Sequence, residues 1–565
     1  MAMFEIPWIT LTMFMPLVGA LILAFVPSEH RDLHRHITTV FMGLTFLVSI
    51  PLVTKFDPAI GTYQLTTGLE NIAWIPAIGA RYHVGIDGIS LWLVMLTTFL
   101  GPIVVLSGYG AIENRVKEYH LCLLVLQTAM IGALVALDAL LFYVFWELML
   151  VPMYLLIGIW GGQERIYAAV KLFLYTMVGS VLMLIALLYI YFKAGAQSFD
   201  VDTLIAAGVG LTFDEQRLLF VCIAIAFLIK VPIFPTHTWL PDAHVQAPTA
   251  GSVILASILL KMGTYGLMRY AMPLLPDGVF WAAPAIAVLS VIGIVYGALV
   301  AYVQKDVKKL IAYSSVSHLG FVTLGLFAMN EMAVTGALYQ SLAHGISTGG
   351  LFLAIGILYE RRHTRMLADY GGLTKQIPVF ATFFVIIAFA SAGVPGLVGF
   401  VGEFMILGGA MSSYALSVNE PRAFVDALGI GPHVSALAFV SVAASGVILG
   451  ALYLLHVVQK MLFGKLDNPK NAELKDLNGR ELTYMVPIVL MCFVMGLFPQ
   501  PFLSRMSASV QRLVASIEDN ANTYGVVVED DAARLSAYRD WLRTGAAVHP
   551  WAVQAETNHG GGEHH

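Results

Sequence analysis

The sequence predicts an all-α polytopic membrane protein with about 14 transmembrane helices. Of its 565 residues, 58% are hydrophobic and only 12% are charged, whereas soluble domains are nearer half apolar and a quarter charged. Apolar runs of about 20 residues, the length that crosses a bilayer, recur along the whole chain. The lysines and arginines between these runs also alternate, with sixteen in one set of loops and six in the other.

The predicted spans follow one another with short loops between them. The fourth and fifth spans are separated only by Asp138. Because lysine and arginine favour cytoplasmic loops, the asymmetry predicts an even number of spans in a bacterial inner membrane, with both termini on the periplasmic side. The spans are centred near residues 17, 44, 100, 128, 148, 180, 229, 260, 291, 318, 346, 395, 449 and 494.

Charge and cysteine content exclude several classes of function. The net charge of −5 is spread over a long chain, so we expect no nucleic-acid partner. The three cysteines lie singly in apolar runs, without the spacing of a disulfide framework or a metal site. After residue 506 the chain turns polar; residues 528–545 have the pattern of a short amphipathic helix, and the His-rich end favours a solvated tail over a metal site. We expect no metal and no cofactor on this chain.

Four ionisable residues fall well inside the apolar spans, and each costs roughly 2.5–3.5 kcal/mol at a bilayer centre. Buried ion pairs stabilise packing poorly compared with apolar residues of equal volume, so a purely structural role is the weaker interpretation. A lysine in hydrocarbon holds its proton less tightly, and a nearby carboxylate restores that affinity. We therefore favour a chain of proton-exchanging sites. The four residues are Glu147, Lys230, Lys261 and Glu403.

Two histidines, His318 and His344, lie at mid depth in consecutive spans and are flanked by serines and threonines. Imidazole titrates near neutrality and can pass a proton between its two nitrogens. We interpret the pair as part of a proton relay. A hydrogen-bonded core and haem ligation are the alternatives.

One span is interrupted directly after Lys230, where Pro232 and Pro235 remove backbone donors and free carbonyls near Leu228 and Val231. Irregular backbone at membrane depth is tolerated only where it is buried in protein or lines a wet cavity. The freed carbonyls and the negative end of the helix dipole suit an ammonium group there. His237 and His244, in the second half-helix, are interpreted as polar lining or packing.

A second span is interrupted by Gly393 and Pro395, shortly before Glu403. Two such breaks in corresponding halves of a chain are typical of transporters built from repeats. The residues alone thus predict a membrane carrier of protons or small cations. The predicted division is three N-terminal spans in 1–118, a first five-helix repeat in 119–271, a second, inverted repeat in 280–463, a last span with its loop in 464–505 and a polar tail in 506–565.

Several motifs resemble the antiporter-like membrane subunits of respiratory complex I, over most of residues 80–465. Glu403 stands where the L and N branches of that family, and cation/proton antiporter subunits, carry a lysine, so the chain resembles the M branch. One departure is Gly399, where many M subunits have asparagine. The matching stretches are "GIDGISLWLV" (85–94), "FWELMLVPMYLLIGIWGG" (145–162), "KVPIFPTHTWLPDAHVQAPTAGSVILASILLK" (230–261), "KKLIAYSSVSHLGF" (308–321) and "GVPGLVGFVGEF" (393–404).

The resemblance implies two inverted five-helix repeats and a proton channel with cytoplasmic entry. It implies FMN, iron–sulfur clusters and quinone in other subunits of a hetero-oligomer. The implied partners are the other antiporter-like subunits, a long lateral helix and lipids. A multi-subunit cation/proton antiporter and a complex-I-related membrane hydrogenase are the alternative assemblies. The implied roles are a coupled pair of Glu147 and Lys230, a central relay at Lys261, an exit-side carboxylate at Glu403, and bridging by His318 and His344.

Overall fold

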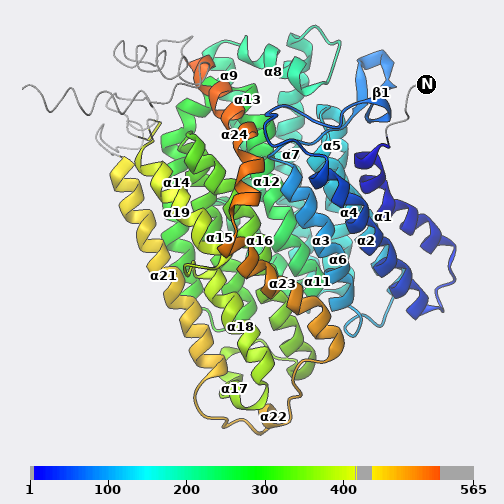
Figure 1. Ribbon diagram of the computed structural model, residues 1–565, viewed down its shortest axis with the longest axis vertical. Helices are drawn as coiled ribbons and strands as arrows, with labels where there is room; N and C mark the ends of the chain where they lie inside the picture. Colours follow the sequence, from blue (N-terminus) through cyan, green and yellow to red (C-terminus); the bar gives the residue numbers. More distant parts are fainter. Residues whose placement is uncertain (1–5, 414, 417–435, 522–565) are drawn as a thin grey trace, which may run out of the picture.

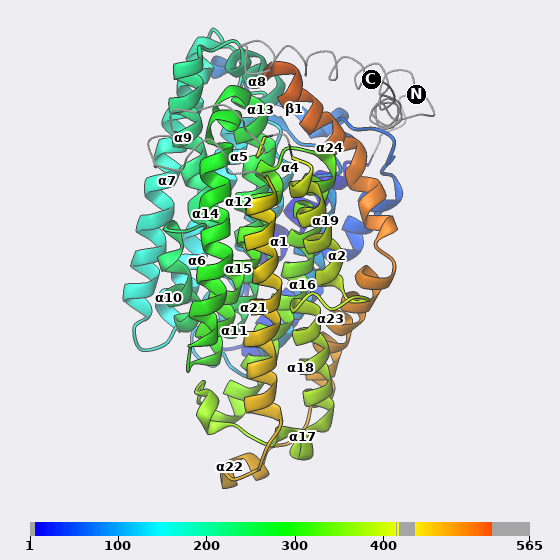
Figure 2. The ribbon, with the colours of Figure 1, turned by 90° about the vertical axis from the view of Figure 1, so that its left-hand side faces the viewer.

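The computed structural model describes residues 6–413, 415–416 and 436–521, and long helices running along one axis dominate it (Figures 1 and 2). Within these residues, eleven helices are long and apolar enough to cross a membrane, and three shorter apolar helices accompany them. Every predicted span centre falls in a helix or in a break between two helices. The exact number of crossings stays a prediction. The amphipathic stretch 528–545 and the His-rich end lie outside the described residues.

The N-terminal region contains a small departure from the all-α prediction. Strands β1 and β2 form an antiparallel hairpin in which Asn71 pairs with His83. Aromatic and β-branched residues favour strands, and Gly79 supplies the left-handed turn with a φ of 67°. The elements here are α1 (Trp8–Phe25), α2 (Arg31–Thr54), η1 (Gly68–Glu70), β1 (Asn71–Ile75), η2 (Pro76–Ile78), β2 (Ala80–His83), α3 (Leu91–Ser107) and α4 (Val116–Val135).

The boundary predicted at Asp138 is confirmed, because α4 ends at Val135 and the Asp138 carboxylate caps the next helix. It accepts hydrogen bonds from the backbone N–H groups of Leu140 and Leu141, both at 3.0 Å. The elements that follow are α5 (Ala139–Leu148), α6 (Leu150–Trp160), α7 (Arg165–Lys193), α8 (Val201–Val209), α9 (Phe213–Lys230), η3 (Thr236–Thr238), α10 (Trp239–Gln246), α11 (Thr249–Ile254), the π-helical η4 (Leu255–Leu259), α12 (Leu260–Gly266), the π-helical η5 (Leu267–Ala271) and α13 (Met272–Leu274).

The second half of the chain continues the bundle, and its interrupted span is the pair α18 and α19. The elements are α14 (Pro276–Tyr302), α15 (Val307–Phe327), α16 (Glu331–Arg362), η6 (Leu367–Asp369), α17 (Leu373–Gln376), α18 (Pro378–Ser391), α19 (Val398–Met411), α21 (Ala436–Leu462), α22 (Pro469–Ala472), α23 (Gly479–Leu497) and α24 (Gln500–Ala521). Helices α17 and α22 lie at one end of the molecule, while α8, the start of α1 and the end of α24 lie at the other (Figure 1).

Burial separates an inner group of helices from an outer one. The apolar windows of the α11–α13 segment and of α16 are 100% buried, and that of α15 is 94% buried. The corresponding windows of α2 and α21 are only 28% and 33% buried. Apolar side chains on the outer helices can face lipid, whereas polar groups on the inner helices must find partners inside the protein. The inner helices carry Lys261, His318 and His344.

Helix α24 continues well into the segment that the sequence predicts as a polar tail. It packs against α16, α14 and α13 and crosses the front of the bundle in Figure 1. Met506, Val510 and Ile517 are buried and recur at helical spacing, which forms one apolar stripe on an otherwise polar helix. The composition of this segment does not reveal the stripe, because only about one residue in four contributes to it and the rest are mostly polar.

Candidate functional site

The first broken helix is confirmed: α9 ends at Lys230 and α10 begins only at Trp239. The carbonyl of Leu228 is freed as predicted, and it accepts hydrogen bonds from the Ile233 N–H at 3.0 Å and the Thr236 hydroxyl at 3.1 Å. The carbonyl of Ile229 accepts one from the Trp239 indole N–H at 2.9 Å. These carbonyls therefore hold the two half-helices together and are not ligands of the Lys230 ammonium.

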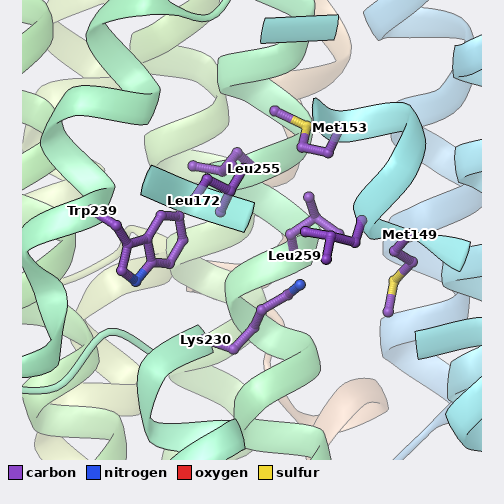
Figure 3. Close-up of a pocket in the computed structure, with 8 residues that line it drawn as sticks. Met149, Met153, Leu172, Lys230, Trp239, Leu255 and Leu259 are labelled. Atoms are coloured by element: carbon purple, nitrogen blue, oxygen red, sulfur yellow. The ribbon is translucent and has the colours of Figure 1, made fainter. Parts of the chain in front are cut away.

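Lys230 lies in an apolar pocket (Figure 3). Its amine points towards Leu259 and lies 5.0 Å from the centre of the Trp146 ring, close enough for a cation–π interaction. The other lining residues are Met149, Leu150, Met153, Leu172, Trp239 and Leu255.

Glu147, on α5, is directed to a different partner. Its carboxylate accepts a hydrogen bond from the Ser180 hydroxyl on α7. Among the described residues, no ion pair within 4.0 Å joins Glu147 to Lys230. The direct coupling of these two residues stays a prediction.

Lys261 lies in α12, between the two π-helical segments. Its Nζ donates to the carbonyl of Ala256 at 2.5 Å and contacts Nδ1 of His344 at 2.6 Å. Which of the two nitrogens donates in this contact depends on which group holds the proton, because a protonated amine can only donate and an imidazole nitrogen can do either. A π-helical turn leaves backbone groups free for such contacts and often marks a functional site.

At the second break, Glu403 is held by two side chains. Its Oε1 lies 2.9 Å from Nδ1 of His318 and accepts a hydrogen bond from Nε2 of Gln340 at 3.0 Å. The break itself is confirmed, since α18 ends at Ser391 and α19 begins at Val398. Gly393 has a φ of 73°, and a Cβ there would lie 3.0 Å from Oε2 of Glu403.

The two histidines connect these contacts. The ring centres of His318 and His344 lie 5.8 Å apart, and Nε2 of His344 has no hydrogen-bond partner among the described residues. Lys261, His344, His318 and Glu403 are each at most 5% exposed. The structure thus brings four of the six predicted residues into one buried row, while Glu147 and Lys230 lie apart from it in their own contacts.

The two histidines of the first break, His237 and His244, pack against aromatic rings. The ring of His244 stacks on Phe352 with 4.5 Å between centres, and that of His237 stacks on Phe234 at 5.8 Å. Both are buried and neither ring nitrogen has a hydrogen-bond partner in the described part of the chain. The contacts favour the packing interpretation of these residues.

Three residues of the site escaped the sequence reasoning. Gln340 precedes His344 by four residues, which places both on one face of α16, so helical spacing could have identified it. Ser180 and Tyr453 lie in apolar runs where no pattern distinguishes their hydroxyls. Tyr453 donates to, or accepts from, Nε2 of His318 at 3.0 Å. With both its nitrogens engaged, His318 is poorly disposed to ligate haem, and the geometry favours the relay interpretation.

Comparison with known proteins agrees with this architecture. The family model described as "NADH:quinone oxidoreductase/Mrp antiporter, TM" matches residues 136–419. NADH-quinone oxidoreductase subunit M of Rickettsia typhi is 43% identical over 518 residues, covering 91% of this chain and 99% of the relative. The subunit M of Rhodobacter capsulatus is 43% identical over 524 residues, covering 90% and 97%.

A solved structure shares the fold. A chain of respiratory complex I from Thermus thermophilus superposes with a TM-score of 0.76 at 30% identity, covering 90% of this chain and 99% of that one. The sequence likeness and the shared fold extend over nearly the whole length of these relatives. The chain therefore belongs to the NADH:quinone oxidoreductase/Mrp antiporter family of transmembrane subunits, in its subunit M branch.

Proposed function

We propose that this chain is a proton-translocating subunit in the membrane arm of an NADH–quinone oxidoreductase. The observation that carries the proposal is the buried row from Lys261 through His344 and His318 to Glu403, in a chain whose relatives are named subunit M. The oxidation of NADH and the reduction of quinone take place in other subunits, with FMN and iron–sulfur clusters bound there. This chain contributes proton movement to the enzyme and no redox chemistry of its own.

The resemblance to antiporter-like subunits implies a direction for the transfer, which we adopt in the proposal. A proton enters from the cytoplasmic side at Lys230, under the influence of Glu147, and passes to Lys261. His344 and His318 relay it to Glu403, which releases it towards the periplasm. Each proton moved against the membrane potential costs roughly 2.3 kcal/mol per 100 mV. Burial keeps the relay from exchanging protons with both sides at once, because water reaches a membrane interior only where polar groups line a path.

The assembly is a hetero-oligomer in a bacterial inner membrane. Neighbouring antiporter-like subunits, a long lateral helix and lipids cover the apolar outer helices. The start of α1 and the end of α24 lie at the same end of the bundle, away from α17 and α22. The basic loops near Arg361 and Lys470 lie with α17 and α22. This supports a periplasmic position for both termini, by the preference of basic loops for the cytoplasm.

A cation/proton antiporter is the second candidate, since the matching family model covers both classes. Glu403 in place of a lysine, and relatives named subunit M at 43% identity, favour the oxidoreductase. In inverted membrane vesicles, sodium-driven pH changes without NADH would favour the antiporter. Pumping that requires NADH would favour the proposal.

The decisive variant is Lys230→Met in the assembled complex. We expect NADH-driven acidification of inverted vesicles to fall about tenfold or more, while electron transfer from NADH to ferricyanide stays normal. Lys193→Met is the control, because Lys193 forms a half-exposed pair with Glu215, 2.8 Å away, at the end of α7. Normal pumping by Lys230→Met would leave only a structural role for this lysine and contradict the proposal.

A further inference from the structure

We propose that Tyr453 is a positioning residue of the proton relay, holding His318 with Nδ1 towards Glu403 in both of the histidine's charge states. The inference rests on the proposed function and adds a residue to it. Tyr453 lies on α21, outside both broken helices and away from every motif in the sequence.

Among the neighbours of His318 Nε2, Tyr453 makes the shorter hydrogen-bond contact. Tyr453 Oη lies 3.0 Å from that nitrogen, and the Ser391 hydroxyl is more distant at 3.5 Å. On the other side of the ring, Nδ1 contacts Glu403 at 2.9 Å. The imidazole is therefore held at both nitrogens, with the tyrosine and the carboxylate at opposite ends of one hydrogen-bonded line.

The chemistry of a hydroxyl suits this position. Neutral imidazole has one donor and one acceptor, and imidazolium has two donors. When His318 is neutral, the Tyr453 hydroxyl donates to Nε2, which puts the ring hydrogen on Nδ1 facing Glu403. When His318 gains a proton at Nε2, the same oxygen accepts from it. A group that only donates or only accepts could serve one of these states but not both.

Tyr453 is a buried residue on a helix that is otherwise largely exposed. Most of α21 is outward-facing, with its apolar window only 33% buried, yet Tyr453 is 0% exposed. A buried hydroxyl without a partner is costly, and the described residues provide two partners for Tyr453, the His318 ring and the Ser314 side chain. Tyr453 thus ties an outer helix to the central histidine of the relay.

The test is Tyr453→Phe in the assembled complex, which removes one oxygen and keeps the ring. Tyr339→Phe is the matched control, since Tyr339 is equally buried and its hydroxyl donates to the backbone carbonyl of Met495. We expect Tyr453→Phe to lower NADH-driven pumping about tenfold, the effect of losing a hydrogen bond to a charged group. The solvent deuterium isotope effect on pumping should rise in Tyr453→Phe only, because proton transfer becomes the slow step.

Glu403→Gln in the same assay separates the two proposals. If Glu403→Gln loses pumping while Tyr453→Phe pumps with an unchanged isotope effect, the positioning role is wrong and the relay stands. If Glu403→Gln pumps normally, the relay itself is wrong.

A second substitution covers the case in which Tyr453→Phe fails to assemble. Fluorotyrosine at position 453 keeps the shape of the side chain but makes its hydroxyl a stronger donor and a weaker acceptor. We expect roughly twofold slower pumping, by the dependence of proton transfer on acid strength. Unchanged pumping would reduce Tyr453 to a packing residue.

Discussion

The two broken helices hold their ionisable residues in opposite ways. Glu403, at the second break, contacts a histidine and a glutamine, both through its Oε1. Lys230, at the first break, lies in an apolar pocket, and its amine faces the Trp146 ring at 5.0 Å from the ring centre. Both breaks use irregular backbone at membrane depth, but only the second places its charged group in a hydrogen-bonded row.

In the proposed relay, this difference means that the contacts of the second half are present in the structure, while those of the first half are not. From Lys261 onwards, Lys261 contacts His344, and the ring centres of His344 and His318 lie 5.8 Å apart. The pocket around Lys230 is lined mostly by leucine and methionine side chains, which cannot carry a proton. Transfer at the first break therefore requires a movement or the entry of water. In the second half, Lys261 already contacts His344 and His318 already contacts Glu403. Only the step between the two histidine rings, whose centres lie 5.8 Å apart, has no hydrogen bond among the described residues. We therefore expect the first break to be the point at which proton transfer is controlled.

The largest effect expected from the comparison concerns Glu403. Glu403→Gln keeps an oxygen acceptor for Gln340 but removes the charge that faces His318. Pumping should fall by about tenfold or more, with normal assembly measured as ferricyanide reduction by NADH. Normal pumping by this variant would show that the residues from Lys261 to Glu403 do not carry the transferred proton.

The next effect concerns the backbone beside Glu403. Gly393→Ala should destabilise the complex by about 1–3 kcal/mol and shift the carboxylate, because the left-handed φ strains alanine and its Cβ would lie 3.0 Å from Oε2. Gly464→Ala is the control, with a φ of 91° and open space around the position. Thermal stability should fall in both variants, but pumping should fall only in Gly393→Ala. Equal pumping by the two variants would mean that the backbone conformation at Gly393 does not determine the position of the Glu403 carboxylate.

A smaller effect is expected at the first break. Trp239→Phe removes the hydrogen bond to the Ile229 carbonyl and should cost about 1 kcal/mol. Amide exchange over residues 229–239 should speed up, while the region around Glu403 stays protected. Trp160→Phe is the control, since that indole bonds an exposed carbonyl of Asn114 at 2.8 Å. Unchanged exchange at the first break would mean that proline alone maintains it.

The smallest effect concerns a carboxylate outside both breaks, which gives a reference for the comparison. Glu70 accepts hydrogen bonds from the backbone N–H groups of Ile9 and Thr10, at 3.1 and 3.2 Å, and burial raises the pKa of its carboxyl group. A raised pKa favours the folded state at low pH, and this contribution is lost as pH rises through the folded-state pKa. Amide exchange at the start of α1 should therefore speed up beyond its intrinsic rate as pH rises above the ordinary titration range of a carboxyl group. Glu70→Gln should abolish that dependence, and a dependence that persisted would point to another group.

Sequence reasoning could identify the breaks because proline, glycine and intramembrane charge are visible without coordinates. Lys230, Lys261 and Glu403 stood out for the same reason, and His318 and His344 for their polar flanks. The partners could not be predicted, since contacts such as Glu147 with Ser180 or His318 with Tyr453 join helices far apart in the chain. The hairpin of β1 and β2 and the apolar stripe of α24 were missed because short or sparse patterns are lost beside long apolar runs.

The most direct test of the relay is proton pumping by the assembled complex carrying Lys261→Met. In the proposed relay Lys261 links the two halves, and it contacts the Ala256 carbonyl and His344. Lys117→Met is the matched control, because Lys117 also donates to backbone carbonyls, those of Ala24 and Val26, both at 2.8 Å, but lies outside the relay. We predict that Lys261→Met assembles and loses NADH-driven pumping while Lys117→Met retains it. Full pumping by assembled Lys261→Met would contradict the relay.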